Sequence, residues 1–163
     1  MEQTRLTHDH HGGLVVFLIG MTIAKPWRPD LWLPVFTAMP RMLRELETRE
    51  GSGLLGYEYL LMGPNPTVLQ YWDGPESLYA YAADRDSRHL PAWREFNQRA
   101  RAHPGAVGIW HETYVVDSAE TLYNNTRPRG LARATRAVPA APGRAAARRV
   151  SLARGPGQPH ARA

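Results

Sequence analysis

The chain of 163 residues contains no cysteine, and this absence excludes several kinds of site at once. No disulfide can form, no thiolate can ligate a metal, and no cysteine can act as a catalytic nucleophile. The chain also has no Gly-rich phosphate-binding loop, no His-Glu-x-x-His motif and no Ser-His-Asp ordering. Nucleotide hydrolysis and zinc-dependent hydrolysis are therefore disfavoured.

Long apolar segments are also scarce. The run from Leu14 to Ile23 is too short to span a bilayer. It lacks the basic leader and the small-residue cleavage site of a signal peptide, because His8 to His11 and two acidic residues precede it. We therefore expect a cytoplasmic protein with no membrane partner.

Acidic residues are missing from the segment 127–163, whose nine arginines give it a charge of +9, whereas residues 1–126 carry a net −4. This shift predicts a disordered leader over 1–12, a folded domain with a C-terminal extension over 13–126, and a disordered Arg/Ala/Pro/Gly-rich tail over 127–163. No aromatic residue follows Tyr123, so the tail has charge but no platform on which bases could stack. Non-specific electrostatic contact is open to the tail, but we predict no specific nucleic-acid partner.

Hydrophobic periodicity predicts six main elements between residues 14 and 116. The apolar patterns favour strands over 14–24, 54–62, 67–72 and 106–116, and helices over 30–46 and 77–98, the second with a short first part over 77–83. Pro40 lies inside the first helical pattern and removes a backbone donor, so we expect a kink or an early break there.

The predicted order β-α-β-β-α-β is that of ferredoxin-like α+β domains. Helices on one face of such a sheet leave the opposite face bare, and large side chains on a bare face need a cover. A second copy of the same sheet is the economical cover. The fold predicted is therefore a dimeric α+β barrel, formed by a homodimer with a cavity between each sheet and its helices.

The segment from Asp84 to Gln98 combines a helix start with one polar group on an apolar face. Asp86 or Ser87 can cap the first turn, and His89, Trp93 and Phe96 then follow at i, i+4 and i+7. The imidazole of His89 should therefore point with the apolar face. It is either a core histidine bonded to a backbone carbonyl or to Asp86, or the reactive group of a pocket.

Several short blocks of the sequence carry a resemblance to a known family: Phe17–Met21, Lys25–Trp27, Trp32–Pro34, Ala38–Leu46, Gln70–Trp72, Arg85–Asn97 and Gly108–Tyr114. Through these blocks the chain resembles a family of monooxygenase-like proteins that includes a monooxygenase of fungal fumagillin biosynthesis, and that is grouped with antibiotic-biosynthesis monooxygenases of the dimeric α+β barrel class. The resemblance covers residues 14–126. Near its end Glu120, Tyr123 and Asn125 match the family's Glu-x-x-Tyr-x-Asn-Met-Pro pattern, whereas Thr126-Arg127 replaces Met-Pro.

The resemblance implies an oxidoreductase of secondary metabolism that acts on a small hydrophobic, polyketide- or terpenoid-like substrate. His89 would then be a general base that forms a substrate carbanion, with no cofactor. In related barrels that degrade haem, a histidine at a similar place ligates the iron, so haem binding or haem degradation is the first alternative. The second alternative is a non-catalytic barrel that only holds a small ligand.

Four further residues are candidates for binding the substrate. Trp93 and Tyr71 would shape the pocket, and Arg88 would hold a carboxylate or a haem propionate. His111 lies in the middle of a predicted strand on the same face as Ile109, Thr113 and Val115, with Glu112 on the other face. It faces either the cavity or water at the sheet edge, and the residues alone favour water.

Overall fold

A computed structural model describes residues 4–141 of the chain. The chain divides into two compact units. The first unit is Gly12–Val115, and the second combines residues 4–11 with residues 116–141 of the described part of the chain. The first unit ends at Val115, whereas the sequence predicted a domain whose C-terminal extension runs to residue 126.

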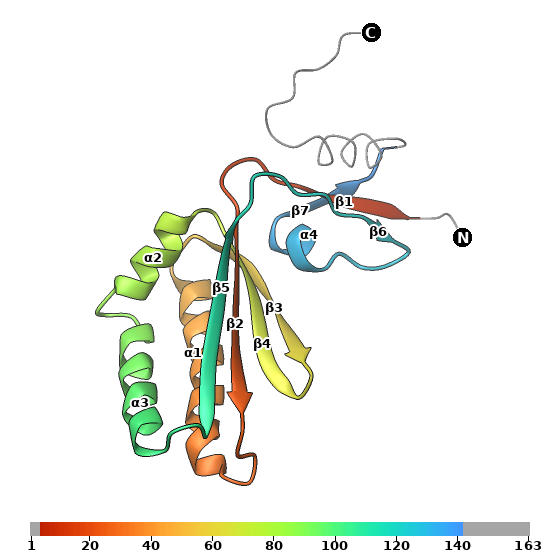
Figure 1. The fold of residues 1–163 in the computed structure, drawn as a ribbon. Coiled ribbons are helices and arrows are strands. Elements are labelled where there is room, and N and C mark those ends of the chain that lie inside the picture. Colours follow the sequence, from red (N-terminus) through yellow and green to blue (C-terminus); the bar gives the residue numbers. More distant parts are fainter. Residues whose placement is uncertain (1–3, 142–163) are drawn as a thin grey trace. The chain divides into compact units, whose positions relative to one another are not determined.

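The first unit contains a four-stranded antiparallel sheet (Figure 1). Strand β2 lies inside the sheet between β4 and β5, and β3 forms the edge next to β4. The ferredoxin-like α+β prediction is confirmed, because the two strands that follow α1 form a hairpin and the last strand returns beside the first. The strands are β2 (Val15–Ile23), β3 (Leu54–Met62), β4 (Asn65–Trp72) and β5 (Val107–Val115).

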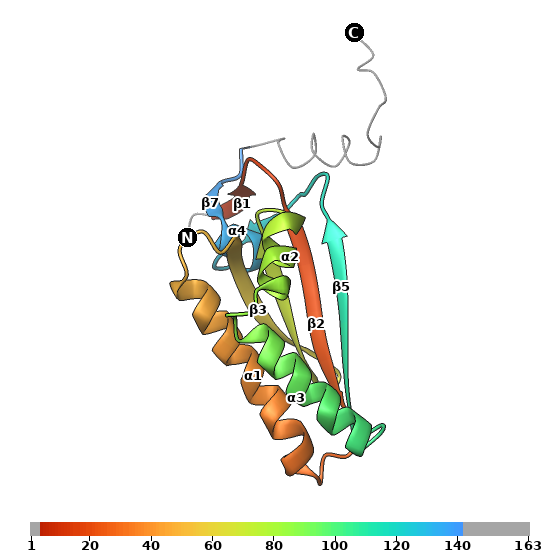
Figure 2. The same cartoon turned by 90° about the vertical axis from the view of Figure 1, so that its left-hand side faces the viewer.

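Three helices cover one face of this sheet (Figure 2). They are α1 (Pro29–Thr48), α2 (Pro75–Ala83) and α3 (His89–Ala102). The predicted early break in the first helix is wrong, since α1 continues through Pro40. Leu43 and Leu46, which follow that proline, are buried. Their burial offsets the cost of about 3 kcal/mol that a proline inside a helix carries.

The expected cap of the next helix is also wrong. The Ser87 hydroxyl donates backwards to the Asp84 carbonyl at 2.8 Å, and the Asp86 N–H donates to the Asp84 carboxylate at 2.9 Å. Both residues therefore stabilise the turn after α2 and leave the first turn of α3 without a cap from its own segment. Ser87 faces this way because it is buried against the end of α2.

The core of the unit lies where α1 and α2 meet the sheet. Its largest fully buried side chain is Trp72, whose indole N–H donates to the Gln70 side-chain oxygen at 3.0 Å. This bond satisfies the polar atom that burial of a tryptophan would otherwise leave without a partner. The cluster consists of Val15, Leu46, Trp72, Leu78 and Tyr81.

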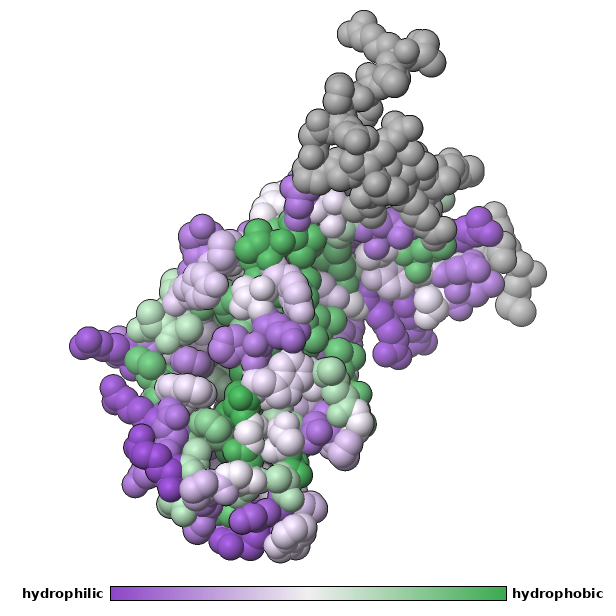
Figure 3. Space-filling view, in the orientation of Figure 1, coloured by the Kyte–Doolittle hydropathy of each residue, from purple (hydrophilic) through white to green (hydrophobic). Residues whose placement is uncertain are grey.

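Strand alternation separates the two faces of the sheet. His111 is paired directly with Ile19, and Thr113 with Phe17, on the face that the helices cover. The opposite face carries large side chains that remain partly exposed, including Leu60 and Tyr114. In the space-filling view, hydrophobic residues gather over the sheet, and hydrophilic residues cover the outer sides of α2 and α3 (Figure 3).

The second unit contains a small antiparallel sheet in the order β6-β1-β7. The predicted disorder is wrong for β1, which falls in the leader 1–12, and for α4 and β7, which fall in the tail 127–163. Composition could not reveal this, because β1 and β7 are far apart in the chain and become ordered by pairing with each other. Residues 142–163 lie outside the described part of the chain. The elements are β1 (Arg5–Asp9), β6 (Tyr123–Asn124), α4 (Gly130–Ala134) and β7 (Arg136–Pro139).

Between residues 4 and 141, no helix combines the length and the hydropathy needed to cross a bilayer.

Candidate functional site

A pocket of about 610 Å³ lies between the helix-covered face of the sheet and helices α1, α2 and α3. Small side chains at the inner faces of the three helices, such as Ala38, Ala82 and Ala92, leave this space open. Apolar side chains supply most of the wall, among them Phe17, Ile19, Met21, Val35, Met39, Val68, Leu78, Phe96 and Ile109. The site is thus a chamber for an apolar molecule of modest size.

His89 lies in the wall of this pocket at the first position of α3. Its Nδ1 is 3.1 Å from the backbone carbonyl oxygen of Ala82, at the end of α2. A carbonyl can only accept, so this bond assigns the proton of the neutral ring to Nδ1 and leaves a lone pair on Nε2. The ring of Tyr81 lies beside it, with 6.2 Å between the ring centroids.

His89 therefore both bonds to a backbone carbonyl and lines the pocket, although the sequence presented a core position and a pocket position as alternatives. Burial lowers the pKa of His89 below its ordinary value, and the hydrogen bond to Ala82 offsets part of this shift. The neutral form is the form favoured near pH 7, and it carries a nitrogen that can accept a proton or ligate a metal. The hydrogen bond to the Ala82 carbonyl therefore leaves His89 with one ring nitrogen, Nε2, that has a lone pair.

His111 supplies a second imidazole on the opposite wall, from strand β5. Its ring lies 5.6 Å from the ring of Phe17, and its side chain is exposed at the edge of the sheet. His111 is therefore exposed to water, as the residues alone suggested, and it also lines the pocket.

Trp93 and Phe96 complete the helix face that the spacing predicted. Both line the pocket together with His89, and their rings stack with 5.6 Å between centroids. Trp93 is 45% exposed, so it also forms part of the pocket's rim. The i, i+4, i+7 series therefore lies along one wall of the pocket.

Tyr71 and Arg88 do not line this pocket. Tyr71 is paired with Val16 and alternates with Gln70 and Trp72, which places it on the other face of the sheet. The prediction that Tyr71 shapes the pocket is therefore wrong for this chamber.

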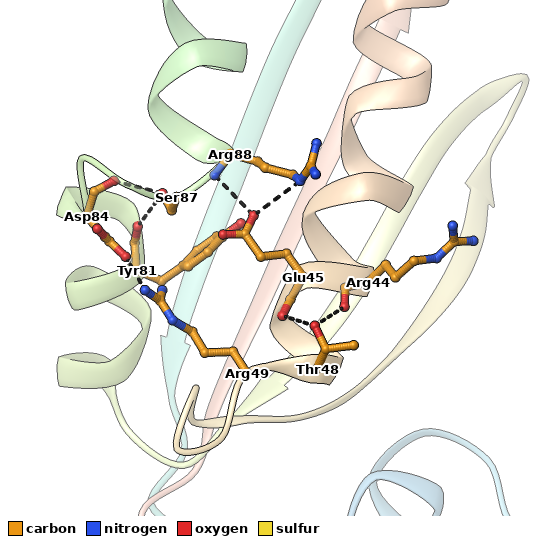
Figure 4. Close-up of polar contacts among 8 residues, drawn as sticks. All are labelled: Arg44, Glu45, Thr48, Arg49, Tyr81, Asp84, Ser87 and Arg88. Carbon is orange, nitrogen blue, oxygen red and sulfur yellow. Dashed lines mark hydrogen bonds and ion pairs between the residues drawn. The ribbon is translucent and has the colours of Figure 1, made fainter.

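Arg88 is directed toward helix α1. Its backbone N–H donates to Glu45 Oε2 at 3.1 Å, and its Nε lies 3.9 Å from the same oxygen (Figure 4). Since its guanidinium pairs with a carboxylate outside the pocket, the predicted role of Arg88 in holding a carboxylate or a propionate is not supported.

Sequence reasoning missed one ion pair in the pocket wall. Arg99 donates to Glu95 at 2.5 Å and to the Asp30 carbonyl at 3.0 Å. The i, i+4 spacing of Glu95 and Arg99 on one helix could have indicated this pair. Within the described residues no group of three or more His, Asp or Glu side chains could hold a metal ion.

Comparisons with known proteins agree with this architecture. Residues 14–131 match the protein family described as Monooxygenase af470-like. Monooxygenase af470 from Aspergillus fumigatus is 34% identical over 67 residues, which are 39% of this chain and 22% of the relative. The match therefore spans only about a fifth of that relative's length.

Two solved structures are similar in fold. An aldoxime dehydratase in complex with butyraldoxime has a TM-score of 0.59 and 17% identity, over 74% of this chain and 36% of that one. SnoaB, a cofactor-independent oxygenase from Streptomyces nogalater, has a TM-score of 0.47 and 10% identity, over 66% of this chain and 97% of its own.

Proposed function

The chain belongs to the Monooxygenase af470-like family, and we propose that it is a monooxygenase that oxidises a small hydrophobic metabolite in the pocket between sheet and helices. His89 acts as the general base. The observation that supports this role most strongly is the Nδ1 bond to Ala82, which leaves Nε2 free to accept a proton in an apolar pocket.

The proposed reaction begins at an acidic C–H bond of the substrate. Nε2 of His89 removes a proton from a CH₂ group that is conjugated with a carbonyl, and the resulting carbanion reduces dioxygen to form a C–O bond. The hydroperoxide then loses water to give a ketone. One oxygen atom enters the product and one enters water, and the CH₂ carbon supplies all four electrons.

The walls of the pocket support this step. Apolar side chains such as Met39 and Ile109 would surround the carbanion with a mostly apolar wall and so reduce its contact with water. Trp93 and Phe96 offer a flat surface against which a planar substrate can pack. His111, on the opposite wall, can donate to the oxygen atom on which the carbanion's charge collects.

A haem-dependent activity is a second candidate, favoured by the same hydrogen bond. A histidine that ligates a metal usually donates its other N–H to a carbonyl or carboxylate, so Nε2 of His89 is the atom that would hold the haem iron. Haem would supply redox chemistry at its iron. Haem also carries two propionate groups, which need a cationic partner. Arg99 lines the pocket but already pairs with Glu95. The described residues therefore offer a ligand for the iron in His89, but no unpaired cation in the pocket wall for the propionates.

We also propose a homodimer in which the uncovered face of one sheet packs against the same face of a second copy. Leu60, Met62 and Tyr114 are between 39% and 53% exposed, although all three are large and apolar or aromatic. Leu60→Glu would place a charge on this face and should convert the dimer to a monomer in light scattering. A wild-type protein that is monomeric at micromolar concentration would contradict the dimer.

The test of the activity uses dithranol, a planar anthrone with an acidic CH₂ group, and an oxygen electrode. Wild-type protein should accelerate oxygen uptake, and His89→Ala should reduce the rate about 10²- to 10⁴-fold, the usual contribution of a general base. His103→Ala removes an exposed histidine at the end of α3 and should leave the rate unchanged.

Two other results would overturn the proposal. If His89→Ala kept the wild-type rate, His89 would not be the base. If the protein bound dithranol but did not accelerate oxygen uptake, the non-catalytic binding role would be favoured. An absorption band near the Soret region after addition of haemin, lost in His89→Ala, would favour the haem candidate.

A further inference from the structure

The turn between α2 and α3 decides where the His89 ring lies. His89 is the first residue of α3, and its hydrogen-bond partner Ala82 belongs to the last turn of α2. The bond between them therefore depends on how the two helix ends are held together. Within the turn, Ser87 and Asp86 bond back to Asp84 and give the turn one defined shape.

The N-terminus of α3 lacks a cap from its own segment, and α1 supplies one instead. Glu45 Oε2 accepts the backbone N–H of Arg88 at 3.1 Å, immediately before His89 (Figure 4). The first N–H groups of a helix have no partner within the helix, and the positive end of its dipole attracts a carboxylate. Glu45 thus does from another helix what an N-cap side chain does locally.

The backbone contact matters more than the side-chain pair between the same residues. The Glu45 side chain is only 22% exposed, whereas that of Arg88 is 65% exposed and its Nε is 3.9 Å away. A long ion pair in water contributes little. A charge-assisted bond from a main-chain N–H to a partly buried carboxylate is stronger and fixes the backbone itself.

A second contact from α1 holds the other end of the turn. Arg49 Nη2 donates to the Asp84 carboxylate at 2.6 Å (Figure 4). Glu45 and Arg49 are four residues apart and so lie on one side at the end of α1. They contact the two ends of the turn, Arg88 and Asp84.

We propose that Glu45 is a positioning residue for His89: its carboxylate caps α3 from helix α1 and keeps the His89 ring bonded to Ala82 with Nε2 directed to the pocket. This inference rests on the proposed function, because it assigns Glu45 a part in the same site. Glu45 touches neither the pocket nor the imidazole, and it acts through the backbone of Arg88.

The titration of His89 can report on the position of its ring, because the charged and titratable groups nearby are not the cause of its pKa shift. Tyr81 lies beside the ring from α2, Glu45 and Arg49 approach from α1, and Asp84 and Arg88 belong to the turn. The pKa of His89 is shifted by burial and by the Ala82 bond, not by any of these charges. Burial also raises the pKa of Tyr81 far above its ordinary value, so Tyr81 stays neutral while His89 titrates.

The experiment follows the His89 ring by NMR in protein labelled with ¹⁵N- and ¹³C-histidine, with signals assigned by His89→Gln. Glu45→Ala should move the His89 titration midpoint upward, toward that of a solvated histidine, and reduce the share of the Nδ1–H tautomer. Glu45→Asp, which keeps the charge but is one CH₂ shorter, should act in the same direction. Glu45→Gln, whose amide oxygen can still accept the Arg88 N–H, should give the same His89 signals as the wild type.

Glu47→Ala is the matched control, because Glu47 is also an acid on α1 but bonds to the Tyr57 hydroxyl. It should leave the His89 signals unchanged. With dithranol, Glu45→Ala should lower kcat about tenfold to a hundredfold, the range for a displaced catalytic group, and change KM less than twofold.

The inference is overturned if the His89 signals in Glu45→Ala and Glu45→Asp equal those of the wild type. It is also overturned if they move but kcat does not fall while His89→Ala is inactive. If His89→Ala itself keeps full activity, the proposed function fails, and the NMR result still decides whether Glu45 positions the ring.

Discussion

Helices α2 and α3 cover the same face of the same sheet, but they do so in different ways. α2 buries Leu78 and Tyr81 against Trp72, in the main core cluster. α3 is longer and has no buried residue at all. One end of the layer between helices and sheet is filled, and the other contains the pocket of about 610 Å³.

This difference separates stability from function within one small domain. The filled end supplies the burial of apolar surface that stabilises the fold. The end under α3 buries less apolar surface, and it contains the pocket, which has the imidazoles of His89 and His111 in its walls. His89 lies where the two ends meet, next to Tyr81 and in the pocket wall, so the solid end can hold it in place.

The largest expected effect concerns the free energy of unfolding, which should fall more on truncation of a side chain in α2 than on truncation of one in α3. Leu78→Ala should lower the free energy of unfolding by about 2–5 kcal/mol, because it removes a buried side chain of the core cluster that also borders the pocket. Trp93→Ala removes a larger side chain but should cost less than about 1 kcal/mol, since that ring is 45% exposed and borders open space. Urea denaturation followed by circular dichroism measures both. Equal losses would show that α3 packs as tightly as α2.

The next effect tests whether the hollow end tolerates filling. Ala92→Phe places a ring in the pocket and should raise the KM for dithranol at least about tenfold, which corresponds to about 1.4 kcal/mol. The free energy of unfolding should change by less than the roughly 1–3 kcal/mol that overpacking costs in a solid core. Ala80→Phe, on the exposed side of α2, is the control and should leave KM unchanged.

The smallest effect concerns pH. The pKa of His89 lies below its ordinary value in the folded protein, so the unfolded chain binds the proton first as the pH falls. The stability contributed by neutral His89 is therefore complete above about pH 6.5 and declines as the pH falls from there through the folded-state pKa. His89→Gln should flatten the slope of unfolding free energy in this window. An unchanged slope would show that the ring is solvated.

Much of this outcome could be predicted from residue patterns. Alternation and helical spacing identified the strands of the ferredoxin-like sheet, and the i, i+4, i+7 series of His89, Trp93 and Phe96 identified one pocket wall. Two of the errors share a cause. α1 continues through Pro40 and β1 pairs with β7, because contacts between distant residues outweighed local preference. The Ser87 hydroxyl instead bonds to Asp84, three residues earlier, because Ser87 is buried against the end of α2.

The sequence by itself determined the order of the elements and the side of each element that is apolar, since both follow from periodicity along the chain. It placed His89 on the apolar face of its helix. Only the tertiary structure decided that Tyr71 lies on the other face from the pocket and that Glu45 supplies the cap of α3. Such facts depend on which segments meet in space, and local patterns contain no information about that.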